Sequence, residues 1–96
     1  MSSLHTINRS PSRELLETCA SLLMQGDAVL FIEDGVYYCL GQDCWPDLLT
    51  DVRVYSLRED MNARGILDRN ATSAKLINYE QFVELCCKYD KTVSWF

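Results

Sequence analysis

The chain has 96 residues, of which 48% are hydrophobic, and it carries a formal net charge of -5. This length fits a single domain, residues 1–96, and the apolar fraction is too high for a disordered chain. The acidic balance argues against direct nucleic-acid binding, because phosphate contacts need clustered Lys and Arg. A chain this short also leaves apolar surface exposed, so we expect an oligomer, including a homo-oligomer when the chain is alone.

The first elements expected along the chain are a strand and a helix. Ser3–Ile7 is predicted as a short strand. Ser10 is placed to cap the helix that follows, and Pro11 suits its first position. The helix is expected to run to about Gln25, where Gly26 is placed to end it. Five residues recur at helical spacing and predict one buried face: Leu15, Leu16, Cys19, Leu22 and Leu23.

The middle of the chain is dominated by one apolar run. Ala28–Ile32 is continuously apolar, which is typical of a strand covered on both faces. Residues 33–35 end that strand with turn chemistry. Val36–Leu40 fits either a strand or the first turn of a helix, and both alternatives stay open. Residues 41–51 are expected to form a loop, with Pro46 interrupting regular structure.

The last third returns to alternating strands and helices. Val52–Leu57 alternates and is predicted as a strand, and one or two helical turns follow over residues 58–65. Residues 74–79 contain a short predicted strand. Residues 79–90 predict an amphipathic helix whose buried stripe is Phe82, Leu85, Cys86 and Tyr89. Residues 92–96 form an apolar aromatic end that we expect to pack into a groove or an interface.

This alternation defines the expected fold class. Strands that alternate with helices predict an α/β layer fold with a mainly parallel sheet flanked by helices. In such sheets, ligands and reactive groups gather beyond the carboxyl ends of the strands. Three loops are expected there: residues 8–12, 33–38 and 58–65.

Cys19 has two competing interpretations. It falls within the predicted apolar stripe, which favours a buried structural thiol, since free Cys is among the most often buried residues. A reactive thiol needs partial exposure and a nearby positive charge, which Arg9 or Arg13 could supply. Cys19 is about two turns into its helix, so the helix dipole offers little help.

The other cysteines indicate reduced thiols and no disulfide framework. Their count of five is odd and no CxxC pair exists. The N-terminus lacks the apolar core of a secretory signal and no apolar run could span a bilayer, so we expect a cytoplasmic protein. Cys86 is expected in the core and Cys87 at its edge. Cys39 and Cys44 flank a loop, and Cys44 is expected to be the most exposed thiol.

The sequence contains few residues in an arrangement that would bind a cofactor or a metal ion. His5 is the only histidine and has no cysteine at zinc spacing, so it is expected to be a satisfied, semi-buried side chain. No glycine-rich phosphate loop is present. Glu33 and Asp34 fit a solvated turn, and a metal-binding regulatory domain that uses this pair remains the weaker alternative. We therefore expect no cofactor and no metal.

The order of the motifs carries a resemblance. "LHTINRSP" opens the chain, "GDAVLFIEDGVY" follows the first helix, and then come "VYSLREDMNARG", "INYEQFVELCCKYD" and a terminal "SW". This arrangement, which covers Leu4 to Trp95, resembles the TusB/DsrH family of the DsrE-like sulfur-relay proteins.

The resemblance implies a compact Rossmann-like α/β domain that acts in persulfide relay. It implies TusC-like and TusD-like (DsrF-like and DsrE-like) partners in a heterohexamer, no cofactor and no membrane or direct nucleic-acid contact. It leaves two branches open, tRNA wobble-uridine 2-thiolation and dissimilatory sulfur oxidation. "LLETC" matches a DsrH-like cysteine setting, which makes Cys19 the candidate persulfide carrier. The alternative is a non-catalytic scaffold subunit, because the principal sulfur-carrying cysteine of the family belongs to the TusD/DsrE-like partner.

Overall fold

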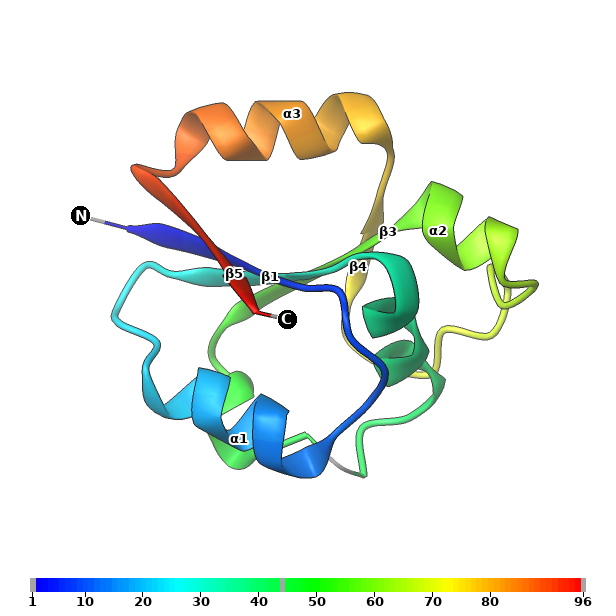
Figure 1. Ribbon diagram of the computed structural model, residues 1–96, viewed down its shortest axis with the longest axis horizontal. Helices are drawn as coiled ribbons and strands as arrows, with labels where there is room; N and C mark the ends of the chain where they lie inside the picture. Colours follow the sequence, from blue (N-terminus) through cyan, green and yellow to red (C-terminus); the bar gives the residue numbers. More distant parts are fainter. Residues whose placement is uncertain (1, 44, 96) are drawn as a thin grey trace.

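The chain forms one five-stranded parallel sheet. The computed structural model describes residues 2–43 and 45–95. The strands lie in the order β4-β3-β2-β1-β5, and each pairing along this order is parallel (Figure 1). Their bounds are β1 Ser3–Ile7, β2 Ala28–Phe31, β3 Arg53–Leu57, β4 Lys75–Ile77 and β5 Lys91–Trp95. The predicted parallel α/β architecture is confirmed.

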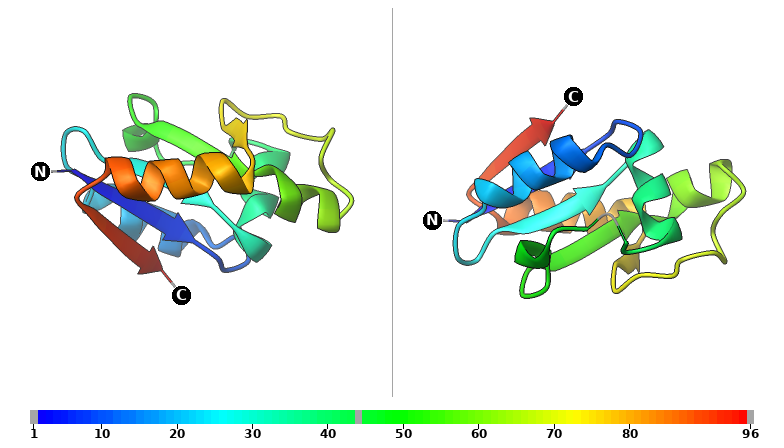
Figure 2. Two further views of the ribbon diagram at one scale, coloured as in Figure 1. Left: turned by 90° about the horizontal axis from the view of Figure 1, so that it is seen from above. Right: turned by 90° about the horizontal axis from the view of Figure 1, so that it is seen from below.

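Helices cover both faces of this sheet. The α-helices are α1 Arg13–Ser21, α2 Arg58–Ala63 and α3 Tyr79–Lys88, and the 3-10 helices are η1 Glu33–Leu40 and η2 Asp47–Leu49. Figures 1 and 2 show α1 on one face and α3 on the other, with η1 and α2 beyond the carboxyl ends of β2 and β3. Within the described residues, no helix is both long and apolar enough to cross a membrane.

The core has one layer on each face of the sheet. All four residues of β2 are buried, as its continuous apolar sequence predicts. Because side chains alternate along a strand, Leu4 and Leu30 join the cluster under α3, whereas Ile7 and Phe31 join the larger cluster under α1. The predicted stripe of α3 is confirmed, since Leu85 and Tyr89 are buried and Phe82 and Cys86 pack beside them.

The predicted bounds of the first helix were wrong at both ends. Its N-cap is Ser12, whose hydroxyl accepts from the Leu15 amide at 3.2 Å, and not Ser10. Its last residue is Ser21, because the Asp27 carboxylate captures the Met24 amide at 3.0 Å and turns the chain off the helix axis. Leu22 is therefore 58% exposed and does not belong to the buried face.

Two segments left open by the sequence are resolved by tertiary contacts. Residues 36–40 belong to the 3-10 helix η1 and not to a strand. At the start of η1, a Cβ added to Gly35 would lie 2.0 Å from the Ile7 carbonyl oxygen, so glycine permits η1 to approach β1. The apolar end of the chain is the edge strand β5, which pairs with β1.

Candidate functional site

The three loops expected at the carboxyl edge of the sheet do meet there. The Arg64 guanidinium donates to the Asp34 carboxylate at 3.0 Å, and the Asp60 carboxylate accepts from the Glu33 amide at 2.6 Å. These contacts join the loop after β2 to the helix after β3. The loop after β1 completes a hollow of about 460 Å³, which is lined by Asn8, Arg9, Ser10, Ser12, Leu15 and Asp34.

This hollow holds neither a thiol nor an imidazole. Among the described residues, no cysteine or histidine lines it, and the Ser12 hydroxyl is engaged as the N-cap of α1. Asp34 is already held by Arg64, and within residues 2–43 and 45–95 no group of three or more His, Cys, Asp or Glu side chains could hold a metal ion. The metal-binding alternative on Glu33 and Asp34 therefore gains no third ligand in the described part of the chain.

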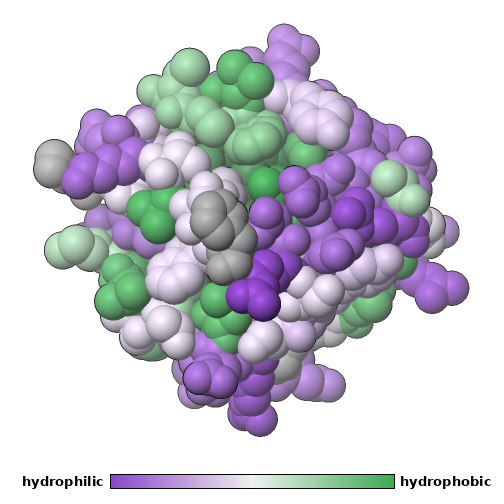
Figure 3. All heavy atoms as spheres, in the orientation of Figure 1, coloured by the Kyte–Doolittle hydropathy of each residue, from purple (hydrophilic) through white to green (hydrophobic). Residues whose placement is uncertain are grey.

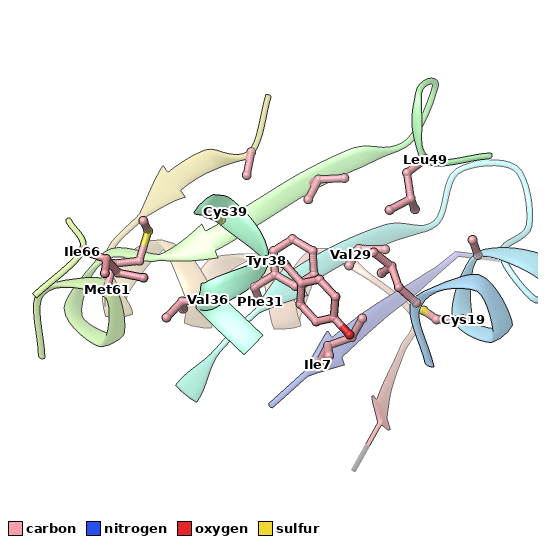
Figure 4. Close-up of a cluster of buried hydrophobic side chains, with 14 residues drawn as sticks. Ile7, Cys19, Val29, Phe31, Val36, Tyr38, Cys39, Leu49, Met61 and Ile66 are labelled. Carbon is pink, nitrogen blue, oxygen red and sulfur yellow. The ribbon is translucent and has the colours of Figure 1, made fainter. Parts of the chain in front are cut away.

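Cys19 lies in the core, as its place in the apolar stripe predicts. Its side chain is 0% exposed and belongs to the cluster between α1 and the sheet, which also contains Ile7, Leu16 and Val29. Figure 4 shows Cys19 among these buried side chains on the face that α1 covers. Neither Arg9 nor Arg13, both exposed, is an ion-pair or hydrogen-bond partner of this thiol.

The surroundings of Cys19 disfavour its thiolate. Burial, with the negative charge of Asp27 as a second cause, raises the pKa of Cys19 from 9.0 to about 12. At neutral pH the thiolate is then on the order of one part in 10⁵ of the population. The thiolate is the nucleophile in sulfur transfer, so both the burial of Cys19 and its raised pKa disfavour attack by this sulfur in this conformation.

The remaining described cysteines differ sharply in access. Cys39 is buried, and burial raises the pKa of its thiol although the Ser56 and Thr72 hydroxyls oppose the shift. Cys87 is exposed, which confirms its predicted place at the edge of the stripe, whereas Cys86 packs against the cluster under α3 but is only half-buried. The prediction that Cys44 is the most exposed thiol lies outside the described residues.

A buried polar chain beneath α1 was not expected from the sequence. The Trp95 indole Nε1–H donates to His5 Nδ1 at 3.0 Å, and His5 Nε2 lies 3.1 Å from the Asp27 carboxylate. These partners place the ring proton on Nε2, because Nδ1 must accept. Both ring nitrogens are therefore occupied, and His5 cannot serve as a base toward Cys19. The predicted satisfied histidine is confirmed.

Asp27 is the centre of this chain of contacts. Its carboxylate also accepts from the Ser3 amide at 2.8 Å and the Met24 amide at 3.0 Å. Burial works to raise the pKa of Asp27, but the hydrogen bonds from Met24, Ser3 and His5 outweigh it and hold the pKa below 3.8. No local pattern could reveal this role, because Ser3 and His5 lie more than 20 residues away in sequence.

Comparison with known proteins gives close matches over nearly the whole chain. The family described as "DsrH like protein" matches residues 9–92. Three similar relatives are each named Protein TusB: those of Pectobacterium atrosepticum, 38% identical, and of Photorhabdus laumondii and Escherichia coli strain SMS-3-5, each 34% identical. Each alignment spans 96% of this chain and 99% of the relative.

The fold and the matches identify the class of protein and then the family. A parallel five-stranded sheet with helices on both faces defines a Rossmann-like α/β protein. Within that class, the matches over nearly the full chain are decisive, and the chain belongs to the TusB/DsrH family of sulfur-relay proteins. The resemblance of its motifs is confirmed.

Proposed function

We propose that this chain is the TusB-like subunit of a cytoplasmic sulfur-relay complex, with TusC-like and TusD-like subunits in a heterohexamer. The observation that carries the proposal is the alignment with relatives named TusB over 96% of the chain. That name favours the branch that leads to 2-thiouridine at the tRNA wobble position over sulfur oxidation. The net charge of -5 suits docking to protein partners, with tRNA contact left to another protein.

Within the complex, we propose that the chain is a structural subunit and that a partner's cysteine carries the sulfur. In each relay step a thiolate attacks the outer sulfur of a donor persulfide. The donor's S–S bond breaks, the donor leaves as a thiolate, and the acceptor cysteine becomes the persulfide. The acceptor must therefore be ionised and accessible. Cys19 is fully buried with its pKa raised to about 12, which supports a packing role.

A second candidate keeps Cys19 as the persulfide carrier after the complex assembles. Leu22 follows Cys19 by three residues and is 58% exposed, so a partner that covers Leu22 would press directly on the end of α1. The helix has only nine residues, and a small displacement would open the layer beneath it. In this alternative the reactive state of Cys19 exists only in the assembled complex.

The test is mass spectrometry of this chain after the reconstituted complex is incubated with a persulfide donor. The variants are Cys19→Ser and the matched control Cys39→Ser, which alters another fully buried thiol. Peptide mapping locates the added sulfur, because the exposed Cys87 is a competing acceptor.

The two candidates predict different results. If the chain is structural, Cys19 gains no sulfur and Cys19→Ser changes the relay rate by less than about two-fold. If Cys19 is the carrier, the wild type and Cys39→Ser gain one sulfur atom on Cys19, and Cys19→Ser abolishes transfer. Failure of the wild-type chain to associate with any relay subunit would refute the proposed function itself.

A further inference from the structure

The edge strand β5 is flanked by helices but is not covered by either of them. It pairs only with β1 in the strand order, so its other side presents backbone groups at the sheet edge. Lys91, Thr92 and Ser94 are exposed, while Val93 and Trp95 are half-buried. An open edge strand is a template for association unless charges, proline or a covering element protect it. β5 has one charged residue, Lys91, at its start, and no proline.

Helix α3 presents an exposed apolar stripe on the flank that faces this edge, with the Cys87 end nearest to β5 and Tyr79 at the far end beside α2. Tyr79, Val83 and Cys87 recur every four residues, and Tyr79 is 53% and Val83 61% exposed. On a right-handed helix that runs opposite to the strands, this row lies on the flank toward β5, next to the buried row of Phe82 and Cys86. Figure 3, which views the molecule with β5 in front, shows apolar side chains gathered over α3.

Helix α1 presents a second apolar row on the opposite side of the same edge. Leu15 is half-buried and Leu22 is 58% exposed, and the spacing of seven residues puts both on one flank. Val93 and Trp95 share this side of the sheet, because they pair with His5 and Ile7, which point toward α1. Figure 3 also shows apolar side chains in the lower part, over α1.

These rows and the strand between them form one surface, which we name the β5 face: Leu15, Leu22, Val83, Cys87 and β5. Its outer margins are mostly acidic, with Arg9 beside Leu15 and Lys91 at the start of β5 as basic exceptions. Glu80 and Glu84 are exposed beside the stripe on α3, and Glu14 is exposed on α1. An apolar centre with a charged rim is the usual anatomy of a protein–protein interface.

We propose that the β5 face docks a subunit of different sequence, whose apolar surface is rimmed by Lys and Arg. This inference rests on the proposed function, since it assigns the surface through which the chain enters its complex. The basic residues of that subunit would lie opposite Glu80 and Glu84 on one side and Glu14 on the other. Complementary rims favour this partner and steer its approach.

The same charges disfavour a second copy of this chain as the occupant. If two copies joined at β5 about an axis perpendicular to the sheet, α3 would meet α3 in antiparallel orientation, and Glu84, near the middle of the helix, would lie nearest to its equivalent. If the axis lay in the sheet and parallel to the strands, α3 would meet α1 in parallel orientation, and Glu80 would lie level with Glu14, because each is in the first turn of its helix. Like charges across an interface select against the pairing in both arrangements.

The first test compares Val83→Arg with Leu48→Arg in binding to purified partner subunits. Val83 is 61% and Leu48 62% exposed, but Leu48 lies on η2, outside the β5 face. Arg has a higher helix propensity than Val, so Val83→Arg should fold, as circular dichroism would verify. We expect Val83→Arg to weaken binding at least about ten-fold, through charge repulsion and loss of apolar contact, and Leu48→Arg to bind as the wild type does.

A second measurement needs no substitution. Cys87 lies within the β5 face and is exposed, so alkylation followed by peptide mapping reports directly on its accessibility. We expect Cys87 to react in the free chain and to be protected several-fold in the complex.

A third measurement reverses the charge of the rim. The double variant Glu80→Lys with Glu84→Lys should weaken binding at low salt and reduce the salt dependence of binding.

The outcomes separate this inference from the proposed function. If the wild type forms a complex, Val83→Arg binds normally and Cys87 stays reactive, the β5 face is the wrong surface while the proposed function stands. If the chain alone forms a dimer that Val83→Arg abolishes, the occupant is a second copy and the inference is overturned. If no relay subunit binds the wild type, the proposed function fails first.

Discussion

Replacing Asp27 with Asn should destabilise the chain through a countable loss of hydrogen bonds. The carboxylate accepts from the amides of Ser3 and Met24 and from the His5 ring, at 2.8, 3.0 and 3.1 Å. One carboxylate oxygen accepts from Met24 and His5 and the other from Ser3, so Asn can keep the first two hydrogen bonds only without the charge and turns its amide toward the Ser3 donor. The lost bond costs about 1.5 kcal/mol and the loss of charge on the other two about as much again, so the expected loss is about 3 kcal/mol, or more than about 10 °C in Tm.

The pH dependence of this loss gives the sharper test. Because the folded-state pKa of Asp27 is held below 3.8, its stabilisation is fully present above 3.8 and disappears as the pH falls through the lower folded-state value. The stability gap between wild type and Asp27→Asn should therefore be widest near neutral pH and close in acid. Urea unfolding followed by tryptophan fluorescence at several pH values measures the gap, with the exposed Asp51→Asn as control. A gap that is small near neutral pH, or that persists unchanged in acid, would refute the role assigned to this carboxylate.

Two further predictions concern the packing at the carboxyl edge of the sheet. Gly35→Ala places a Cβ 2.0 Å from the Ile7 carbonyl oxygen, so η1 must shift, and we expect a loss of about 3 kcal/mol in denaturant unfolding. Gly41→Ala, where an added Cβ meets no atom within 4 Å, is the control, and equal losses would contradict the close approach. Tyr38→Phe removes a hydroxyl that accepts from the Ser12 amide at 2.7 Å and donates to its carbonyl at 2.9 Å. We expect a loss of about 1 kcal/mol in the same assay, with amide exchange faster in the first turn of α1, and unchanged exchange there would rule out this anchor.

Four of the five strands in the described residues and the three α-helices could be predicted because their signals are local, whereas β5 was expected only as an apolar end of the chain. Ala28–Phe31 is an unbroken apolar run, and such a run is stable only where both faces of a strand are covered. Phe82, Leu85 and Tyr89 define the buried side of α3 by spacing alone. In contrast, the end of α1 depends on the Asp27 side chain, so helical periodicity extended it too far.

For the candidate site, too, the sequence predicted the burial of single residues but not the partners that surround them. The apolar stripe predicted that Cys19 is buried, but periodicity could not supply the charge of Asp27, which is a second cause of the raised pKa of this thiol. Arg9 and Arg13, the two cations that could have supplied a positive charge to Cys19, are exposed. The sequence also named His5 as a satisfied histidine without being able to name Asp27 and Trp95 as its partners.

By itself, the sequence determined the α/β class, the parallel sheet and the family and favoured burial of the first-helix thiol, because each depends on residue order or on spacing within one element. Only the tertiary structure decided which elements become neighbours. The strand order places β1 between β2 and β5, and this brings Asp27, His5 and Trp95 together across the sheet. It also leaves β5 as an open edge between two apolar helix flanks. Such features arise from contacts between residues far apart in the chain, and no local pattern of apolar and polar residues encodes them.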